Sequence, residues 1–157
     1  MIVGNSQSLA FDRELVRINR YYQDQDALFH EIATWLREKD LVHETYYEAL
    51  KEREAEFPTG LHTTLYDVAI PHADPVHVKK PFIAFVRPEN ELFFNEMASR
   101  ERTVKPKIIL FLGLMKSEDQ LSVLQKLMKL FSSEEFMRDC VYSNDNERIF
   151  ELLEKAF

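Results

Sequence analysis

The sequence has almost no cysteine, no long apolar run and no excess of positive charge. Its one cysteine, Cys140, excludes an internal disulfide and cannot by itself supply a thiolate zinc site. The longest apolar stretch, residues 108–115, is far shorter than the roughly 20 residues that cross a bilayer. The formal net charge of −7 argues against a surface that neutralises nucleic-acid phosphates. We therefore expect no disulfide scaffold, no membrane insertion and no nucleic-acid binding.

The residues that are present fit an ordinary globular domain. The 157 residues are 45% hydrophobic and 30% charged, which is normal for a folded chain and argues against wholesale disorder. This length is sufficient to bury one substantial core. The start lacks the charged-then-apolar pattern of a secretion signal. We expect a single cytoplasmic domain over residues 1–157, with residues 1–10 as an extended lead-in.

Local patterns predict a chain that mixes helices and strands. A first helix follows the N-cap candidate Asp24, and a second covers about residues 44–54. Apolar or alternating runs predict strands at 14–19, 68–70, 81–87 and 107–115. Capping boxes predict three closing helices, at Ser117-x-x-Gln120, Ser132-x-x-Glu135 and Asn144-x-x-Glu147. The fold class that follows is an α/β single-domain sandwich, a small mixed β-sheet flanked by helices on both sides.

One histidine, His72, stands at a position that suits a nucleophile. His72 follows the short apolar run 68–70 and Pro71, whose ring fixes one backbone dihedral. A strand end is a rigid platform, and the loop after it is expected to leave the ring reachable from solvent. A neutral imidazole has one nitrogen with a free lone pair, while the other can donate a hydrogen bond. Such a ring can form a phosphohistidine intermediate, although a strand-end histidine is also commonly a structural residue.

Three runs of residues resemble a known family. They are Arg53-Glu54-Ala55-Glu56-Phe57-Pro58-Thr59-Gly60, Ala69-Ile70-Pro71-His72 and Asp74-Pro75-x-His77-Val78-Lys79-Lys80-Pro81. Together they resemble the fructose/mannitol-type IIA domains of bacterial sugar phosphotransferase systems. Within that group, the run Glu56-Phe57-Pro58-Thr59-Gly60 is most similar to the galactitol-specific IIA proteins. The resemblance covers roughly residues 31–153.

The resemblance implies a phosphotransferase component that needs no cofactor. His72 would take a phosphoryl group from phospho-HPr and pass it to a cysteine of a IIB component, for uptake of hexitol or galactitol-type sugars. No IIB or IIC segment is present, so we expect a separate subunit that associates only indirectly with a IIC permease. An alternative is a regulatory domain in which phosphorylation of His72 controls a protein partner. The sugar and the oligomeric state stay open.

Two further residues have candidate roles in the site. The resemblance implies that Arg53 anchors the phosphate, whereas Arg53 could also pair with a neighbouring glutamate on an exposed helix face. Gln120 stands where mannitol- and fructose-type members carry a second histidine. Its amide can donate a hydrogen bond to a phosphoryl oxygen, or it can serve the Ser117 capping box.

Three loop residues are possible accessories. Asp74 and His77 can orient the ring or contact a partner, and each can equally be an ordinary loop residue. Thr59 begins a turn with Gly60 and has phosphate contact as a secondary role. No metal site is expected, because the remaining histidines lack companions at metal-ligand spacing; they are His30, His43 and His62.

Overall fold

The computed structural model describes residues 13–157, so the predicted lead-in at residues 1–10 lies outside the described part of the chain. The helices are α1 (Gln25–Glu38), α2 (Tyr46–Glu56), α3 (Ser117–Phe131), α4 (Glu134–Tyr142) and α5 (Asn146–Ala156). The strands are β1 (Val16–Arg20), β2 (Gly60–His62), β3 (Asp67–Ala69), β4 (Phe82–Pro88), β5 (Phe94–Glu96), β6 (Ser99–Val104) and β7 (Ile108–Gly113). Two 3-10 turns, η2 (Arg13–Leu15) and η3 (Pro75–His77), complete the list. Within these residues no helix is long and apolar enough to cross a membrane.

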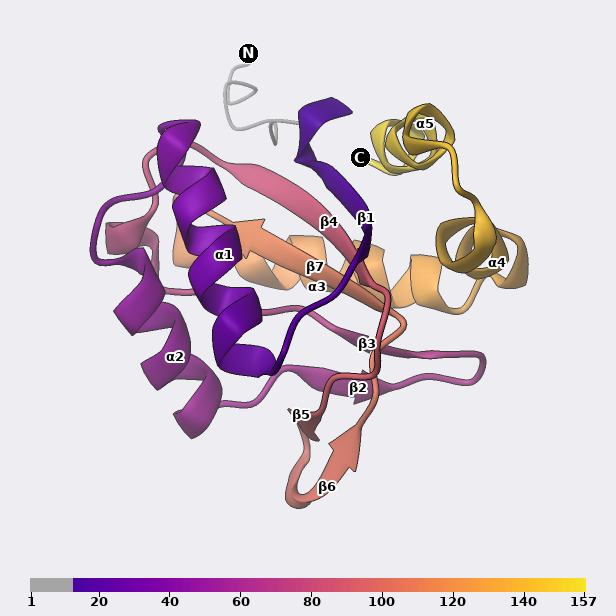
Figure 1. Ribbon diagram of the computed structural model, residues 1–157, viewed down its shortest axis with the longest axis horizontal. Coiled ribbons are helices and arrows are strands. Elements are labelled where there is room, and N and C mark those ends of the chain that lie inside the picture. The colour runs from indigo at the N-terminus through magenta and orange to yellow at the C-terminus, as the bar shows by residue number, and fades with distance from the viewer. Residues whose placement is uncertain (1–12) are drawn as a thin grey trace.

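The strands form one mixed sheet in the order β1-β4-β7-β3-β2-β5-β6 (Figure 1). β4 and β7 are antiparallel, and Phe82 lies opposite Gly113. β3 is parallel to β7, with Val68 opposite Ile108. Because β3 and β7 run in the same direction, the segments that follow them leave the sheet at the same edge. That edge receives residues 70–74 from β3 and residues 114–120 from β7.

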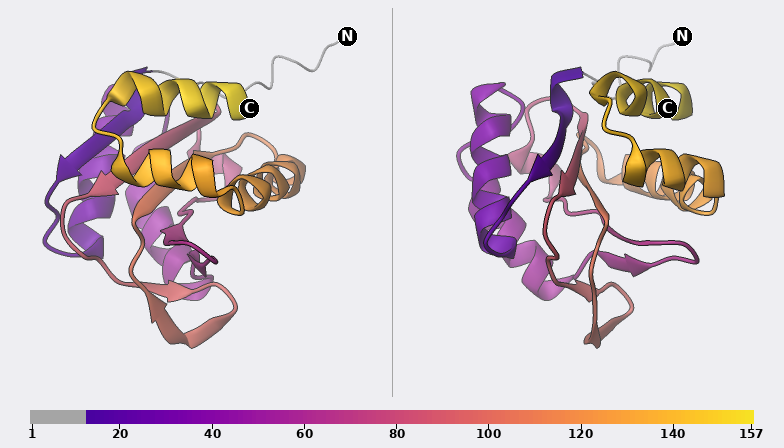
Figure 2. Two further views of the ribbon diagram at one scale, coloured as in Figure 1. Left: turned by 90° about the vertical axis from the view of Figure 1, so that its right-hand side faces the viewer. Right: turned by 45° about the vertical axis from the view of Figure 1, so that its right-hand side comes forward.

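Alternate residues of the inner strands contribute to two separate cores. In β4, Phe82, Ala84 and Val86 pack in the cluster that includes the buried residues of α1 and α2. Ile83 and Phe85 pack in the cluster that includes those of α3, α4 and α5. This alternation follows from the two-residue period of a strand. The sheet therefore lies between two helical layers (Figure 2), and the predicted α/β sandwich is confirmed.

The predicted N-cap of α1 agrees with the structure, whereas those of α3, α4 and α5 do not. Asp24 caps α1 as expected, since its side chain accepts the Ala27 N–H at 2.8 Å. The capping box at Ser117 is wrong, because Ser117 is the first residue of α3 and the cap residue, Lys116, makes no side-chain cap hydrogen bond. The other two boxes are displaced by one residue. The caps of α4 and α5 are Ser133 and Asp145.

Three short strands were not predicted. β2 lies in a segment that we expected to be a loop, and β5 and β6 form a hairpin after the β4 strand. β2 and β5 have three residues each, which is too short a pattern to be separated from a loop, and the six residues of β6 are mostly polar. β2 also depends on close approach at Gly60, where an added Cβ would lie 2.6 Å from the Asn95 carbonyl oxygen. Their pairing is therefore a product of tertiary contacts.

Candidate functional site

His72 lies beside the end of β7. The Leu112 N–H donates to the Pro71 carbonyl oxygen at 3.1 Å, and His72 forms a parallel bridge with Leu112. Pro71 has a restricted φ angle and no N–H to place in the ladder. The backbone that carries the imidazole is thus held by β7, and two residues earlier the Ile70 N–H donates to the Thr59 carbonyl oxygen.

A backbone carbonyl selects the tautomer of His72. The Nδ1 atom lies 2.8 Å from the carbonyl oxygen of Ile70. A carbonyl oxygen only accepts hydrogen bonds, so Nδ1 must carry the hydrogen. In the neutral ring the lone pair is then on Nε2. This assignment makes Nε2 the candidate nucleophile.

The imidazole is more buried than expected. His72 retains only 7% of its exposure, whereas the sequence suggested an openly reachable ring. Burial lowers the pKa of His72 below its ordinary value of 6.5, and the Arg53 cation also lowers it. The Ile70 carbonyl and the Asp74 carboxylate act in the opposite direction but do not outweigh burial. The ring is consequently neutral near pH 7, as a nucleophile requires.

Arg53 belongs to this site and not to a remote helix surface. It lies in the last turn of α2, and its Nη1 donates to Asp74 Oδ1 at 2.8 Å. The guanidinium carbon lies 5.1 Å from the centre of the Phe57 ring. Its Nε is buried without a hydrogen-bond partner. A cation in this position can hold phosphoryl oxygens next to His72.

Glu54 is a buried acid that sequence reasoning missed. Its carboxylate accepts the Thr59 backbone N–H at 2.8 Å and the Thr59 hydroxyl at 2.7 Å. The Thr59 carbonyl in turn accepts the Ile70 N–H at 3.2 Å, and Ile70 lies two residues before His72. Desolvation raises the pKa of Glu54 from 4.5 to about 6, against the lowering effect of the two Thr59 hydrogen bonds and Arg53. Glu54 and Thr59 therefore join the end of α2 to the strand that positions His72.

The sequence offered little to single out Glu54. It is one of several glutamates in the helix, and the polar pattern of α2 resembles a solvated face. A carboxylate five residues before a threonine is a weak signal, because only folding shows that the two meet. The Thr59 hydroxyl, which we considered for phosphate contact, donates its hydrogen to Glu54.

Gln120 and His77 take different places around this edge. Gln120 lies half-buried in the first turn of α3, which follows β7 and so begins at the edge where His72 lies. His77 is in η3, and its Nδ1 lies 2.7 Å from the Thr45 hydroxyl at the start of α2. His77 thus joins two segments next to the site. Asp74 lies between His72 and His77 and contacts Arg53.

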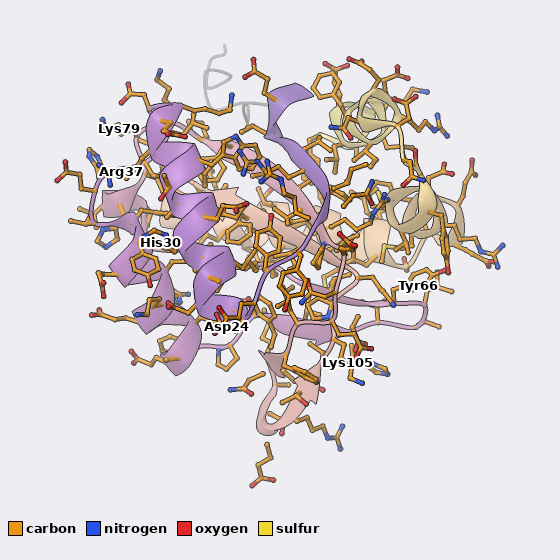
Figure 3. The ribbon with its side chains drawn as sticks, in the orientation of Figure 1. Asp24, His30, Arg37, Tyr66, Lys79 and Lys105 are labelled. Carbon is orange, nitrogen blue, oxygen red and sulfur yellow. The ribbon has the colours of Figure 1, made fainter. Side chains whose placement is uncertain are left out.

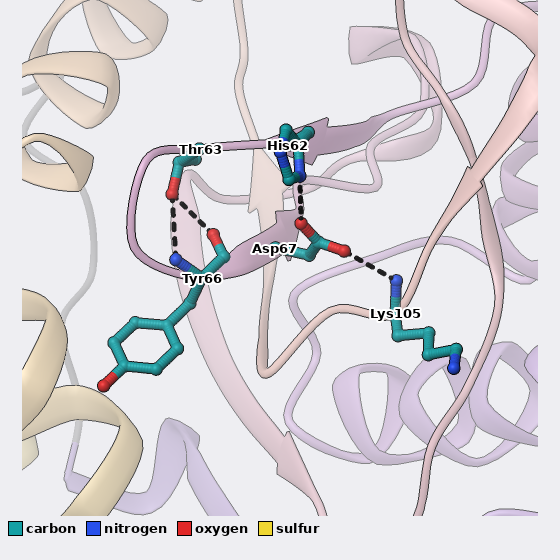
Figure 4. Close-up of polar contacts among 5 residues, drawn as sticks. All are labelled: His62, Thr63, Tyr66, Asp67 and Lys105. Atoms are coloured by element: carbon teal, nitrogen blue, oxygen red, sulfur yellow. Dashed lines mark hydrogen bonds and ion pairs between the residues drawn. The ribbon is translucent and has the colours of Figure 1, made fainter.

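A second histidine, His62, lies in a pocket at the other end of the same strands. The pocket has a volume of about 320 Å³ and is lined by the loops that precede β3 and β7 and follow β4. Figure 3 labels Tyr66 and Lys105 in this region. His62 Nδ1 lies 2.7 Å from Asp67 Oδ1, and the other Asp67 oxygen accepts the Lys105 N–H at 3.0 Å (Figure 4). The His62 side chain is 74% exposed and far from the Arg53 side of the sheet, so it is a suitable control for His72.

The described residues contain no grouping that suggests a metal site. Across residues 13–157, no set of three or more His, Cys, Asp or Glu side chains is arranged to hold a metal ion. Cys140, within the same range, is buried, and burial raises the pKa of its thiol to about 12. Its chemistry is therefore that of an inert core residue. The polar groups at the sheet edge remain the candidate site.

Solved structures share this fold. The chain is similar to the mannitol IIA enzyme of Escherichia coli, solved in complex with phosphorylated IIB, with a TM-score of 0.77. That match covers 94% of this chain and 99% of the other at 16% identity. The nitrogen regulatory protein IIA-Ntr of Neisseria meningitidis has a TM-score of 0.73 at 25% identity, over 90% of this chain and 94% of that one. The fold is therefore the one that these IIA proteins share.

Sequence comparison gives the family. The family described as "Phosphoenolpyruvate-dependent sugar phosphotransferase system, EIIA 2" matches residues 9–156, and this chain belongs to it. The galactitol-specific EIIA component of Escherichia coli (strain K12) is 32% identical over 112 residues, which is 71% of this chain and 74% of that protein. The predicted resemblance to the galactitol type is confirmed.

Proposed function

We propose that this protein carries a phosphoryl group on Nε2 of His72, as the IIA component of a sugar phosphotransferase system. The supporting observation is the hydrogen bond from Nδ1 to the Ile70 carbonyl, which leaves the lone pair on the other nitrogen. Burial keeps the ring neutral, and Arg53 supplies a cation beside it. Phosphoryl transfer depends mainly on such positioning and charge stabilisation.

The transfer consists of two exchanges. In the first, the Nε2 lone pair attacks the phosphorus of a phosphohistidine on HPr, the new N–P bond forms, and the electron pair of the broken N–P bond returns to the donor ring. In the second, a cysteine thiolate of a IIB component attacks the phosphorus, and the electron pair returns to Nε2. The hydrogen stays on Nδ1, donated to the Ile70 carbonyl oxygen throughout, so no proton needs to enter or leave the ring. Arg53 steadies the charge on the transferred oxygens.

The surroundings of His72 suit protein partners. Exposed apolar side chains adjoin the site residues in the chain; they are Phe57, Val76, Met115 and Leu121. Apolar groups mixed with charges at a surface are typical of a transient protein interface. We propose a galactitol or related hexitol pathway because the galactitol-specific relative is 32% identical. The partners are then phospho-HPr as donor and a IIB component as acceptor.

The test is phosphorylation in a reconstituted relay. The chain is incubated with Enzyme I, HPr and phosphoenolpyruvate, and phosphohistidine is measured by ³¹P NMR and by its lability in acid. We expect labelling of the wild type and of His62→Gln, and none of His72→Gln. Thermal unfolding of both variants checks that they fold. An unlabelled wild type, or equal labelling of the His72 variant, would refute the proposal.

A second step separates transport from regulation. The phosphorylated chain is mixed with a galactitol-type IIB component, and phosphocysteine is measured on that protein. Rapid passage supports the transport role. If His72 is labelled but no IIB cysteine accepts the group, the regulatory alternative replaces the transport assignment.

A further inference from the structure

The ion pair between Arg53 and Asp74 occupies the cation that the phosphoryl group would need. Asp74 follows His72 by two residues, and its Oδ1 lies 2.8 Å from Arg53 Nη1. Asp74 is also the cap residue of η3, yet its side chain makes no cap hydrogen bond there. Its carboxylate is thus directed to Arg53 and not to the turn that it begins.

The two partners are held unequally. The Asp74 side chain is 67% exposed, whereas that of Arg53 is 28% exposed. Arg53 is restrained by its position on α2 and by the adjacent Phe57 ring. Asp74 can therefore turn into water while Arg53 stays in place. An ion pair with one exposed member contributes little stability, so breaking it costs little.

The Arg53 guanidinium has a donor that Asp74 does not use. The buried Nε has no hydrogen-bond partner in the unphosphorylated protein. A buried donor without an acceptor is unfavourable, and a phosphoryl oxygen is a strong acceptor. The guanidinium presents its donors in a planar fork that suits two oxygens of one group. A phosphoryl group on His72 can thus accept more hydrogen bonds from Arg53 than the single one that Asp74 accepts.

We propose that Asp74 is a displaceable counter-ion, which holds Arg53 before phosphorylation and is released from it by the phosphoryl group. The proposal rests on the proposed function of His72 as a phosphoryl carrier. Each phosphorylation then breaks one ion pair, which offsets part of the stabilisation that Arg53 gives to phosphohistidine. Asp74 also remains as a negative charge near the bound group. Both effects make the phosphoryl group easier to pass on.

This role suits a carrier. A carrier must accept a group from one partner and surrender it to another, so an unopposed arginine clamp would hold the group too tightly. Both charges act on the ring, since Arg53 lowers the pKa of His72 and Asp74 raises it. Asp74 is accordingly a positioning residue that adjusts the transfer equilibrium through Arg53.

The test compares Asp74→Asn with a matched control, Asp40→Asn. Asp40 pairs with Lys79 at 2.6 Å and is 65% exposed, so it matches Asp74 in exposure and pairing but lies outside the site. Each protein is equilibrated with a fixed ratio of phospho-HPr to HPr, and the phosphorylated fraction is measured by ³¹P NMR. We expect the equilibrium constant for phosphorylation to rise roughly two- to fivefold in Asp74→Asn. The control should equal the wild type.

The direction of the change is decisive, because a merely damaged site would lose phosphorylation. An equilibrium constant that is unchanged or lower in Asp74→Asn would overturn the proposal, provided that the wild type is phosphorylated. If the wild type itself is not phosphorylated, the carrier function fails instead. An NMR titration gives a second readout: the pKa of His72 should fall in Asp74→Asn and not in Asp40→Asn. An unchanged pKa in both variants would also count against the role of Asp74.

Discussion

The proposed function places two opposing demands on the His72 ring. As a phosphoryl carrier, the ring must be buried enough to stay neutral and to be held in one tautomer, yet its Nε2 must be reached by another protein. The hydrogen bond to Ile70 and the 7% exposure satisfy the first demand. For the second demand, His72 lies beyond the end of β3, at the sheet edge where α3 also begins. Reactivity at this scale is set by the contacts of a single nitrogen atom.

The pH dependence of phosphorylation follows from the lowered pKa of His72. An unperturbed histidine would be about three-quarters protonated at pH 6 and would lose most of its nucleophile. Because the pKa of His72 is lower, we expect the initial phosphorylation rate to fall less between pH 7.5 and pH 6 than it would for an unperturbed histidine. The measurement is the rate with pre-formed phospho-HPr, with the ring titrated by NMR in parallel; an apparent pKa at or above 6.5 contradicts this prediction.

Arg53 is predicted to matter through geometry as well as charge. We expect Arg53→Met to slow phosphorylation by about 10²-fold, as loss of one preorganised donor typically does. Arg53→Lys keeps the charge but loses the planar fork, so its rate should be intermediate. The control is Arg37→Met, since Arg37 lies exposed on α1 and pairs with Glu44. Equal rates for Arg53→Met and the control would show that Arg53 has no role in phosphorylation.

At the scale of elements, the site depends on how α2, β2 and β3 are joined. α2 supplies Arg53 and Glu54 from adjacent positions, and Thr59 connects Glu54 to the backbone that carries Ile70. The buried carboxylate replaces water as the acceptor for two donors at the end of the helix. A change in this connection is therefore expected to reach both the stability of the fold and the placement of His72.

The stability of this connection should depend on pH. The pKa of Glu54 is raised from 4.5 to about 6, so the folded protein binds its proton more tightly than the unfolded chain. The resulting stabilisation is complete below pH 4.5 and is lost as the pH rises through about 6, a change of about 1–2 kcal/mol. We expect the difference in unfolding free energy between wild type and Glu54→Gln to fall by this amount from pH 4.5 to 7.5. Urea unfolding at several pH values measures it.

The matched control for this effect is Glu52→Gln. Glu52 is exposed on the same helix, so its difference from the wild type should not follow the Glu54 curve. If the difference between wild type and Glu54→Gln is constant over this pH range, Glu54 does not carry the proton that we assign to it.

In the whole molecule, one sheet separates two hydrophobic cores, and only one of them packs the helix that carries Arg53 and Glu54. One core packs α1 and α2 against the sheet and fixes the arginine and glutamate of the site. The other packs α3, α4 and α5 and contains Cys140. Packing between neighbouring strands is tight at Gly113, the register partner of Phe82, where an added Cβ would lie 2.0 Å from the Phe82 ring. β4 and β7 contribute residues to both cores, so the two layers are coupled through the strands that they share.

Cys140 provides a reporter for the opening of the second core. Its thiol is buried and burial raises its pKa to about 12, so thiolate is scarce and shielded in the folded protein. We expect a thiol reagent to react slowly with the native chain and rapidly in denaturing urea. A Cys140→Ser, Ser132→Cys variant places the thiol at an exposed position and should react at once. Fast labelling of Cys140 in the native protein would contradict the packing of this core.

Part of the candidate site was predictable because the resemblance rests on short local runs. Residues 53–60 and 69–72 together indicated His72 as the candidate carrier and Arg53 as the candidate phosphate anchor. The partner of Arg53 was not predictable, because Asp74 lies 21 residues further along the chain and could equally have remained free in its loop. Glu54 escaped notice for a different reason, since its partner Thr59 is close in the chain but nothing local distinguishes Glu54 from the exposed glutamates on that helix.

Local patterns were enough to predict strands at 81–87 and 107–115, the start of α1 at Asp24 and the place of His72 after a short strand. These features depend on the periodicity and capping of a few neighbouring residues. The burial of the imidazole, the pairing of Arg53 with Asp74 and the strands β2, β5 and β6 arise only when the chain folds. Those features exist because segments far apart in the chain are brought together, and their energies come from desolvation and contacts that no single segment contains.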